Sequence, residues 1–214
     1  MSFRPEQNDT AQGFFRSPPA WVLTFRDGEG FECIGKERTQ AGLAVSCYLS
    51  PLDAAIEAAC LTKAGRPHRS MAASALDLGA FLGERDSELV AAMHVGWPAH
   101  NGVLLRHSDG RPGRCCRLMR QPLGIPTTFE VDARTLAAYS ASRERAGLFA
   151  WAETVREVRT WPATRIRHVA TKAVAAITSR CEADHWKTAT QLAAFDPEFG
   201  QWHFVPFSSG GEAL

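Results

Sequence analysis

Apolar and polar residues alternate in short segments of the first part of the chain, which predicts β-strands. In residues 21–26 every second side chain is large and apolar, and the turn signal Asp27-Gly28 follows directly. Phe31 and Cys33 suggest a returning strand, and residues 42–49 form an apolar run typical of a buried strand. We therefore expect the fold to begin with neighbouring strands.

A helix with clear boundary signals follows this apolar run. Ser50 is a natural N-cap, Pro51 suits the first helical position, and Gly65 marks the end. Apolar side chains recur at spacings of four with alanines beside them, so we expect one face of the helix to pack on a sheet.

An antiparallel meander is predicted for the middle of the chain. Residues 88–97 alternate as a strand, and the turn signals Asn101-Gly102 and 108–113 separate it from shorter strands at 103–105 and 114–120. Each connection is short enough to join neighbouring antiparallel strands.

The last third of the chain changes to helical spacing. Asp132 can cap a helix that begins at Ala133, apolar residues recur at helical spacing over 148–158, and Pro162 starts another helix. Alternating segments within 191–207 then predict a terminal hairpin.

This order of elements predicts an α+β fold, with helices packed on one side of a mainly antiparallel sheet. C-terminal helices followed by a short hairpin complete the expected fold, and a regular βαβ alternation is missing. The 214 residues suit one domain, which we place at 21–207 between flexible tails at 1–20 and 208–214.

Composition and cysteine usage point to a globular protein of a reducing compartment. Hydrophobic residues make up 45% and charged residues 22%, and no apolar run approaches the roughly 20 residues that span a bilayer. Residues 1–20 lack an export signal, so the six cysteines are expected as free thiols in the cytoplasm. Abundant Ala and an excess of Arg over Lys suggest a bacterial source.

The chain carries its positive charge unevenly, although its formal net charge is only +1. Residues 100–180 hold 14 Lys and Arg against 6 Asp and Glu. Within residues 106–120, where Asp109 is the one acidic residue, we define an arginine series that is suited to an acidic partner: Arg106, Arg111, Arg114, Arg117 and Arg120. No aromatic residue accompanies the series, so an acidic protein surface is favoured over a nucleic acid.

The sequence holds none of the known phosphate-cradling glycine motifs and no metal-ligand spacing, so we expect no cofactor and no metal. One catalytic alternative remains open. Cys47 lies near the end of a strand that feeds a helix and could serve as the nucleophile of a hydrolase or transferase. Its base could be His94, His100 or His203, oriented by Asp53 or Asn101.

The function favoured by these observations is a non-catalytic bacterial protein-binding module that uses the arginine series. An immunity protein that neutralises an antibacterial toxin, or a secretion adaptor, is the predicted kind of module. The thiol enzyme is the alternative, and a nucleic-acid-binding accessory protein using the 106–120 arginines is a second one. We expect no membrane association.

Overall fold

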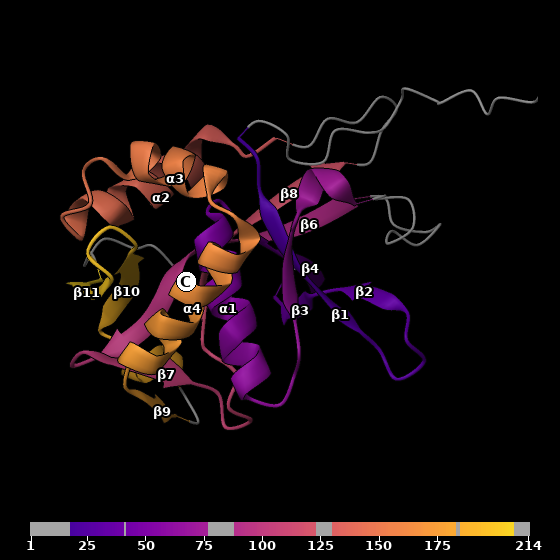
Figure 1. Ribbon diagram of the computed structural model, residues 1–214, viewed down its shortest axis with the longest axis horizontal. Coiled ribbons are helices and arrows are strands. Elements are labelled where there is room, and N and C mark those ends of the chain that lie inside the picture. The colour runs from indigo at the N-terminus through magenta and orange to yellow at the C-terminus, as the bar shows by residue number, and fades with distance from the viewer. Residues whose placement is uncertain (1–17, 41, 77–87, 123–129, 183–184, 208–214) are drawn as a thin grey trace, which may run out of the picture.

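The computed structural model describes residues 18–40, 42–76, 88–122, 130–182 and 185–207 (Figure 1). The predicted tails at 1–20 and 208–214 lie outside this part, except that Pro18 and Pro19 are half-buried and Ala20 is buried in the core. The α+β class is confirmed: within the described ranges, eleven strands form a mixed, mostly antiparallel sheet with helices packed against it.

The long strand β6 (Glu88–His100) is the centre of the sheet. Its N-terminal half lies between β4 (Gly42–Tyr48), which runs parallel to it, and β8 (Cys115–Pro122), which runs antiparallel. Its C-terminal half pairs with β7 (Val103–Arg106) and β10 (Gln191–Asp196), both antiparallel. β11 (Gln201–Pro206) completes the predicted hairpin with β10.

The predicted meander is wrong in its pairing. β8 pairs with β6 and not with β7, because the connection after β7 returns the chain to the other half of β6. β7 takes β9 (Ser179–Cys181) as its second neighbour instead, in parallel. One strand thus serves two sets of neighbours, which the spacing of turns along the chain does not reveal.

The first strands of the chain form the side of the sheet beyond β4. β1 (Trp21–Arg26) pairs with β2 (Glu32–Ile34), with β4 and with β5 (Arg69–Ala72). β3 (Lys36–Thr39) pairs with the start of β4. The short η1 turn (Ala73–Ala75) follows β5.

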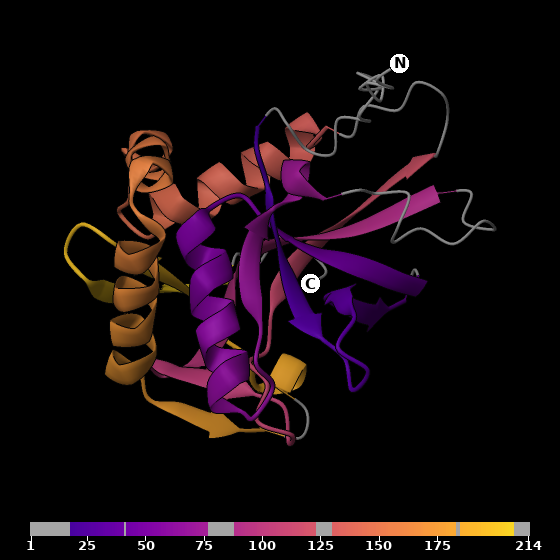
Figure 2. The same cartoon turned by 45° about the vertical axis from the view of Figure 1, so that its right-hand side comes forward.

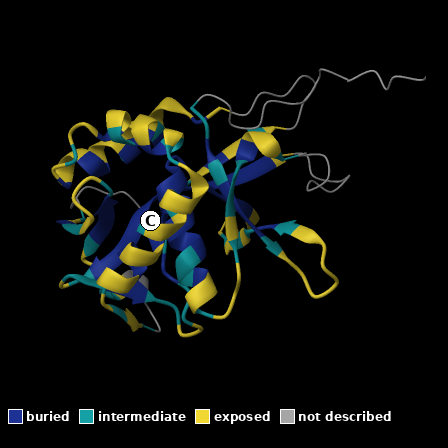
Figure 3. Ribbon diagram, in the orientation of Figure 1, coloured by how far each residue is buried: buried dark blue, intermediate teal, exposed yellow. Residues whose placement is uncertain are grey.

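Helix α1 (Pro51–Lys63) begins as the sequence predicts, because the buried Ser50 Oγ accepts hydrogen bonds from the backbone of Leu52 and Asp53. The expectation of one buried face is wrong, however. The first eight residues of α1 are all buried, including Asp53 and Glu57, because α1 packs against the sheet and against further helices (Figure 3).

The remaining helices come from the last third of the chain: α2 (Ala133–Arg145), α3 (Trp151–Thr160), α4 (Ala163–Ala176) and the short α5 (His185–Thr188). Asp132 caps α2 through a 2.7 Å hydrogen bond from Thr135 N, as predicted. α4 lies beside α1, and Figure 2 shows α2 and α3 across the end at which α1 begins. No helix of the described residues has the length and apolarity needed to cross a membrane.

A bulge at Gly96 decides which side chains of β6 face α1. The register between β6 and β8 shifts between His94 and Gly96, which inverts the alternation beyond that point. His94 and Trp97 therefore meet on the same side, with ring centroids 4.4 Å apart. A strictly alternating strand, which the sequence predicts, would place them on opposite faces.

Candidate functional site

The arginine series is divided by the structure. Arg111 and Arg114 line one cavity together, whereas the other three arginines lie outside its lining. Arg106 and Arg117 are half-buried on β7 and β8, and the exposed Arg120 forms an ion pair with Glu88 at 3.2 Å. The use of the series as one partner-binding surface stays a prediction.

The Arg114 side chain points into the protein and contacts a cluster of polar side chains between the sheet and α1. Its side chain is 15% exposed, and its guanidinium lies within 4 Å of four polar side chains: Glu37 at 2.8 Å, Ser46 at 2.9 Å, Tyr48 at 3.4 Å and Glu57 at 3.8 Å. Glu57 also accepts a 2.8 Å hydrogen bond from the indole of Trp97. Strands that are distant in sequence are therefore joined to α1 by charge-assisted contacts.

Burial controls the charge states in this cluster. It raises the pKa of the Glu57 carboxyl to about 7, although the Arg114 guanidinium acts against the rise. It also holds the pKa of His94 well below its ordinary value, with the charges of Arg143 and Arg114 adding to the effect. Since Glu57 and His94 are each only 1% exposed, these two side chains are closed to a substrate and suit a structural role.

A second buried pair holds α2 against the first turn of α1. Arg143 Nη2 donates to Asp53 Oδ2 at 2.8 Å, and both side chains are almost fully buried. The guanidinium also stacks on the rings of Tyr139 and Trp151, 4.9 and 4.7 Å from their centroids. Burial raises the pKa of Asp53 while Arg143 lowers it, so the carboxylate depends on its partner.

The structure does not assemble the thiol site that the sequence left open. Cys47 is fully buried, and burial raises the pKa of its thiol above the ordinary value, with Glu37 adding to the rise. Cys47 packs in the core cluster that contains Met93, whereas His94 packs on Tyr48 across the sheet. A nucleophile needs a lowered pKa or an adjacent base, and this thiol has neither among the described residues.

The other histidines considered as bases are engaged elsewhere. His100 Nδ1 lies 3.0 Å from the Thr190 hydroxyl and its Nε2 lies 3.1 Å from Asn101, in an exposed turn. His203 contacts Asp196 at 3.6 Å on the terminal hairpin. Within the described ranges, no group of three His, Cys, Asp or Glu side chains could hold a metal ion.

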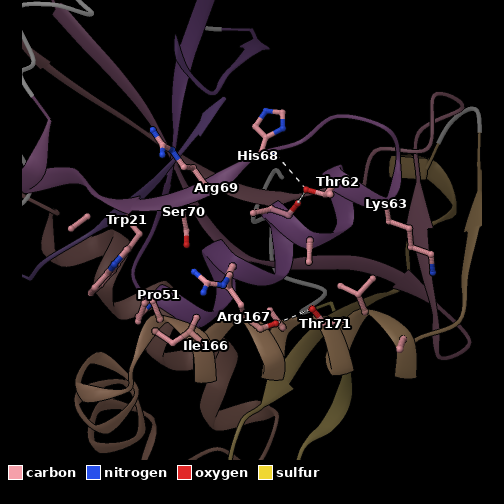
Figure 4. A pocket seen from close by; sticks show the side chains of 18 residues that line it. Trp21, Pro51, Thr62, Lys63, His68, Arg69, Ser70, Ile166, Arg167 and Thr171 are labelled. Atoms are coloured by element: carbon pink, nitrogen blue, oxygen red, sulfur yellow. Dashed lines mark hydrogen bonds between the residues drawn. The ribbon is translucent and has the colours of Figure 1, made fainter. Parts of the chain in front are cut away.

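A groove with a volume of about 750 Å³ lies between α1, α4 and β5 (Figure 4). Small side chains line the two helices: Ala55, Ala58, Ala59, Ala163, Ala170 and Ala175. Trp21, Pro51 and Ile166 close one end in Figure 4, and Thr62, Lys63 and His68 stand at the other. The small alanine side chains of the two helices thus leave an open groove.

The edges of this groove are basic. Lys63 and Arg167 are exposed, His68 is half-buried, and all three line it, whereas no carboxylate is part of its lining. Arg69 also contributes, although its guanidinium turns away from the helices to form an ion pair with Glu32. An apolar floor with a cationic edge is complementary to an amphipathic, acidic ligand.

Sequence reasoning missed this groove because its walls come from three segments that are far apart in the chain. The signal that could have found it is the pair of alanine-rich helices, α1 and α4, each with a basic residue beside its small side chains. Comparison of the chain with protein-family models, with curated proteins and with solved structures finds no match.

Proposed function

We propose that this chain is a non-catalytic protein-binding module that docks an acidic, amphipathic helix of its partner in the groove between α1, α4 and β5. The observation that carries the proposal is the apolar, alanine-lined floor bordered by Lys63, His68 and Arg167. Helices laid in apolar grooves are a recurrent mode of peptide recognition.

The dimensions of the groove support a helix as the occupant. Alanine side chains allow a third helix to approach closely, because the distance between packed helices is set by the side chains at the contact. α4 has 14 residues and therefore rises about 21 Å along the groove. That length accommodates roughly four turns of a partner helix.

The charges support an acidic partner. Carboxylates flanking the apolar stripe of such a helix would lie beside Lys63 and Arg167, both exposed. These rim contacts would speed association and set orientation, while the alanine floor would supply the apolar contact. The acidic partner that the sequence predicted is thus retained, at a different surface from the arginine series.

The biological classes named from the sequence belong to the same proposal. A toxin-neutralising immunity protein and a secretion adaptor of a bacterium both act by binding one partner without chemistry. A cytoplasmic location is supported by the six cysteines, all of which are free thiols. The partner's own activity would distinguish the two classes.

A displayed library of helical peptides tests the proposal directly. The library would be selected on the wild-type protein, and the enriched peptides would then be measured against two matched variants. Ala175→Glu places a carboxylate in the groove, and Ala176→Glu places one on the adjacent exposed residue outside its lining. We expect enrichment of peptides with an apolar stripe flanked by Asp or Glu, and a loss of about tenfold or more in affinity for Ala175→Glu only.

Charge dependence provides the second criterion. Arg167→Glu should weaken the same peptides, and the exposed Lys172→Glu on the same helix, outside the lining, should not. Enrichment of basic or uncharged peptides, or equal binding by Ala175→Glu and Ala176→Glu, would overturn the proposal.

A further inference from the structure

A second cavity, of about 430 Å³, lies on the other side of the segment that links α1 to β5. It is formed by β1, the connection between β2 and β3, the end of α1 and the loop before β8. Its lining contains six basic side chains and no carboxylate: Arg26, Lys36, Arg66, His68, Arg111 and Arg114. Four separate segments of the chain contribute these residues.

Two of the arginines are held in place at its exposed edge. Arg66 Nη2 and Arg111 Nε both donate to Asp109 Oδ2, at 3.3 and 2.7 Å. Asp109 Oδ1 accepts a further hydrogen bond from the Arg111 backbone at 3.1 Å. One carboxylate thus orients two guanidinium groups, and each retains further N–H donors for a ligand.

Arg114 forms the deeper wall. Its side chain is 15% exposed, against 49% for Arg66 and 41% for Arg111. Contacts with Ser46 and Glu37 hold it, so its position is built into the fold. Guanidinium groups at two depths suit a tetrahedral, multiply charged anion, which can accept hydrogen bonds from several directions.

The same cavity has an apolar wall. The rings of Phe25 and His68 lie 5.0 Å apart, and Leu23, Leu61 and Pro67 complete the lining beside them. The His68 ring is positioned by this contact with Phe25 and by its Nδ1, which lies 2.8 Å from the Arg66 carbonyl oxygen. A ligand that fills this cavity therefore needs an anionic group and an apolar or ring portion.

We propose that this cavity binds a small organic phosphate, with its phosphoryl group against Arg66, Arg111 and Arg114 and its organic portion against Phe25 and His68. The volume falls within the range of small-molecule sites. This inference is separate from the proposed function. The cavity and the groove between α1, α4 and β5 have almost entirely different linings and share only His68.

Phenyl phosphate, inorganic phosphate and benzoate form a matched set of probes for calorimetry and two-dimensional NMR. Phenyl phosphate carries both features, and each of the others lacks one. We expect saturable one-to-one binding of phenyl phosphate, about tenfold or more tighter than either control probe. Its largest amide shifts should fall on Gly35 and His68, which line the cavity.

Three variants test the arginines. Arg66→Gln and Arg111→Gln should each weaken phenyl phosphate about tenfold, because a charge-assisted contact is lost while the exposed position tolerates the change. Arg120→Gln, from the same arginine series but outside the lining, should bind as the wild type does. Unfolding midpoints of all three would confirm that the fold is intact.

The proposal is overturned if phenyl phosphate fails to saturate at millimolar concentrations, if benzoate binds as tightly, or if Arg120→Gln loses as much affinity as Arg111→Gln. Shifts confined to the α1–α4 groove would also overturn it.

Discussion

Removing Arg143 should destabilise the fold far more than removing an exposed arginine. The Arg143→Met variant retains an apolar side chain beside Tyr139 and Trp151 but leaves the Asp53 carboxylate buried without its ion pair. The side chains of Asp53 and Arg143 are 2% and 0% exposed, so water cannot replace the lost guanidinium. We expect a loss of about 3–5 kcal/mol in the free energy of unfolding, the range for breaking a buried pair.

Urea unfolding followed by tryptophan fluorescence measures this loss, because Trp151 contacts the substituted residue. The matched control is Arg156→Met on α3, whose ion pair with Glu153 is mostly exposed. That variant should lose at most about 1 kcal/mol. The double variant Asp53→Leu/Arg143→Met removes both charges, and its loss should fall below the sum of the two single losses by about 2 kcal/mol.

The pH dependence supplies a further check. Burial already raises the pKa of Asp53, and loss of the guanidinium would raise it more. The folded variant would then bind a proton that the unfolded chain releases, so the deficit relative to wild type should shrink as the pH falls. A loss no larger than that of Arg156→Met, or additive single and double variants, would refute the reasoning.

Two further predictions concern the sheet and the Arg114 cluster. Because the folded pKa of Glu57 is raised from 4.5 to about 7, this carboxyl should contribute a loss of about 3 kcal/mol of stability as the pH rises through that interval. His94, whose pKa is lowered, acts in the opposite direction over part of the same range, so the Glu57 contribution is measured as the difference between wild type and Glu57→Gln. Glu57→Gln should remove most of this dependence in urea unfolding across the same range, and an unchanged slope would contradict the assignment. A Cβ at Gly96 would lie 2.7 Å from Leu192, so Gly96→Ala should cost about 1–3 kcal/mol. Gly28→Ala, with no atom within 4 Å of its added Cβ, is the control, and equal losses would argue against the clash.

Local signals account for what the sequence could predict about the fold. The side chains of Ser50 and Asp132 bind backbone groups within three residues, so their caps are visible in a short window. The same holds for the hairpin of β10 and β11, whose pairing is set by one turn. The α+β class followed because such windows cover most of the described strands and helices.

Pairings between distant segments could not be predicted. Asp53 and Arg143 are separated by 90 positions, and nothing near either residue identifies the other. The parallel contact of β4 with β6 depends on how α1 crosses the sheet, and the bulge at Gly96 depends on the close approach of Leu192. Each of these features is decided by tertiary packing between distant segments, which a short stretch of sequence does not reveal.

The candidate sites show the same division. Arg111 and Arg114 were identified from their spacing, but Arg26 and Arg66 reach the same cavity from other segments. The sequence therefore predicted part of the positive charge in this region, but not that the region forms a cavity.

The sharing of β6 between two sets of strands also determines when the chain can fold during synthesis. Its C-terminal half pairs Trp97 with Ala193 of β10, which follows α4 in the sequence. A nascent chain that has emerged only through α4 therefore exposes this edge and the apolar side chains behind it. Contacts of such high sequence separation slow folding and leave an unpaired strand open to aggregation. The ribosome-bound protein thus has a vulnerable interval that ends when the terminal hairpin docks, and chaperone dependence should be concentrated there.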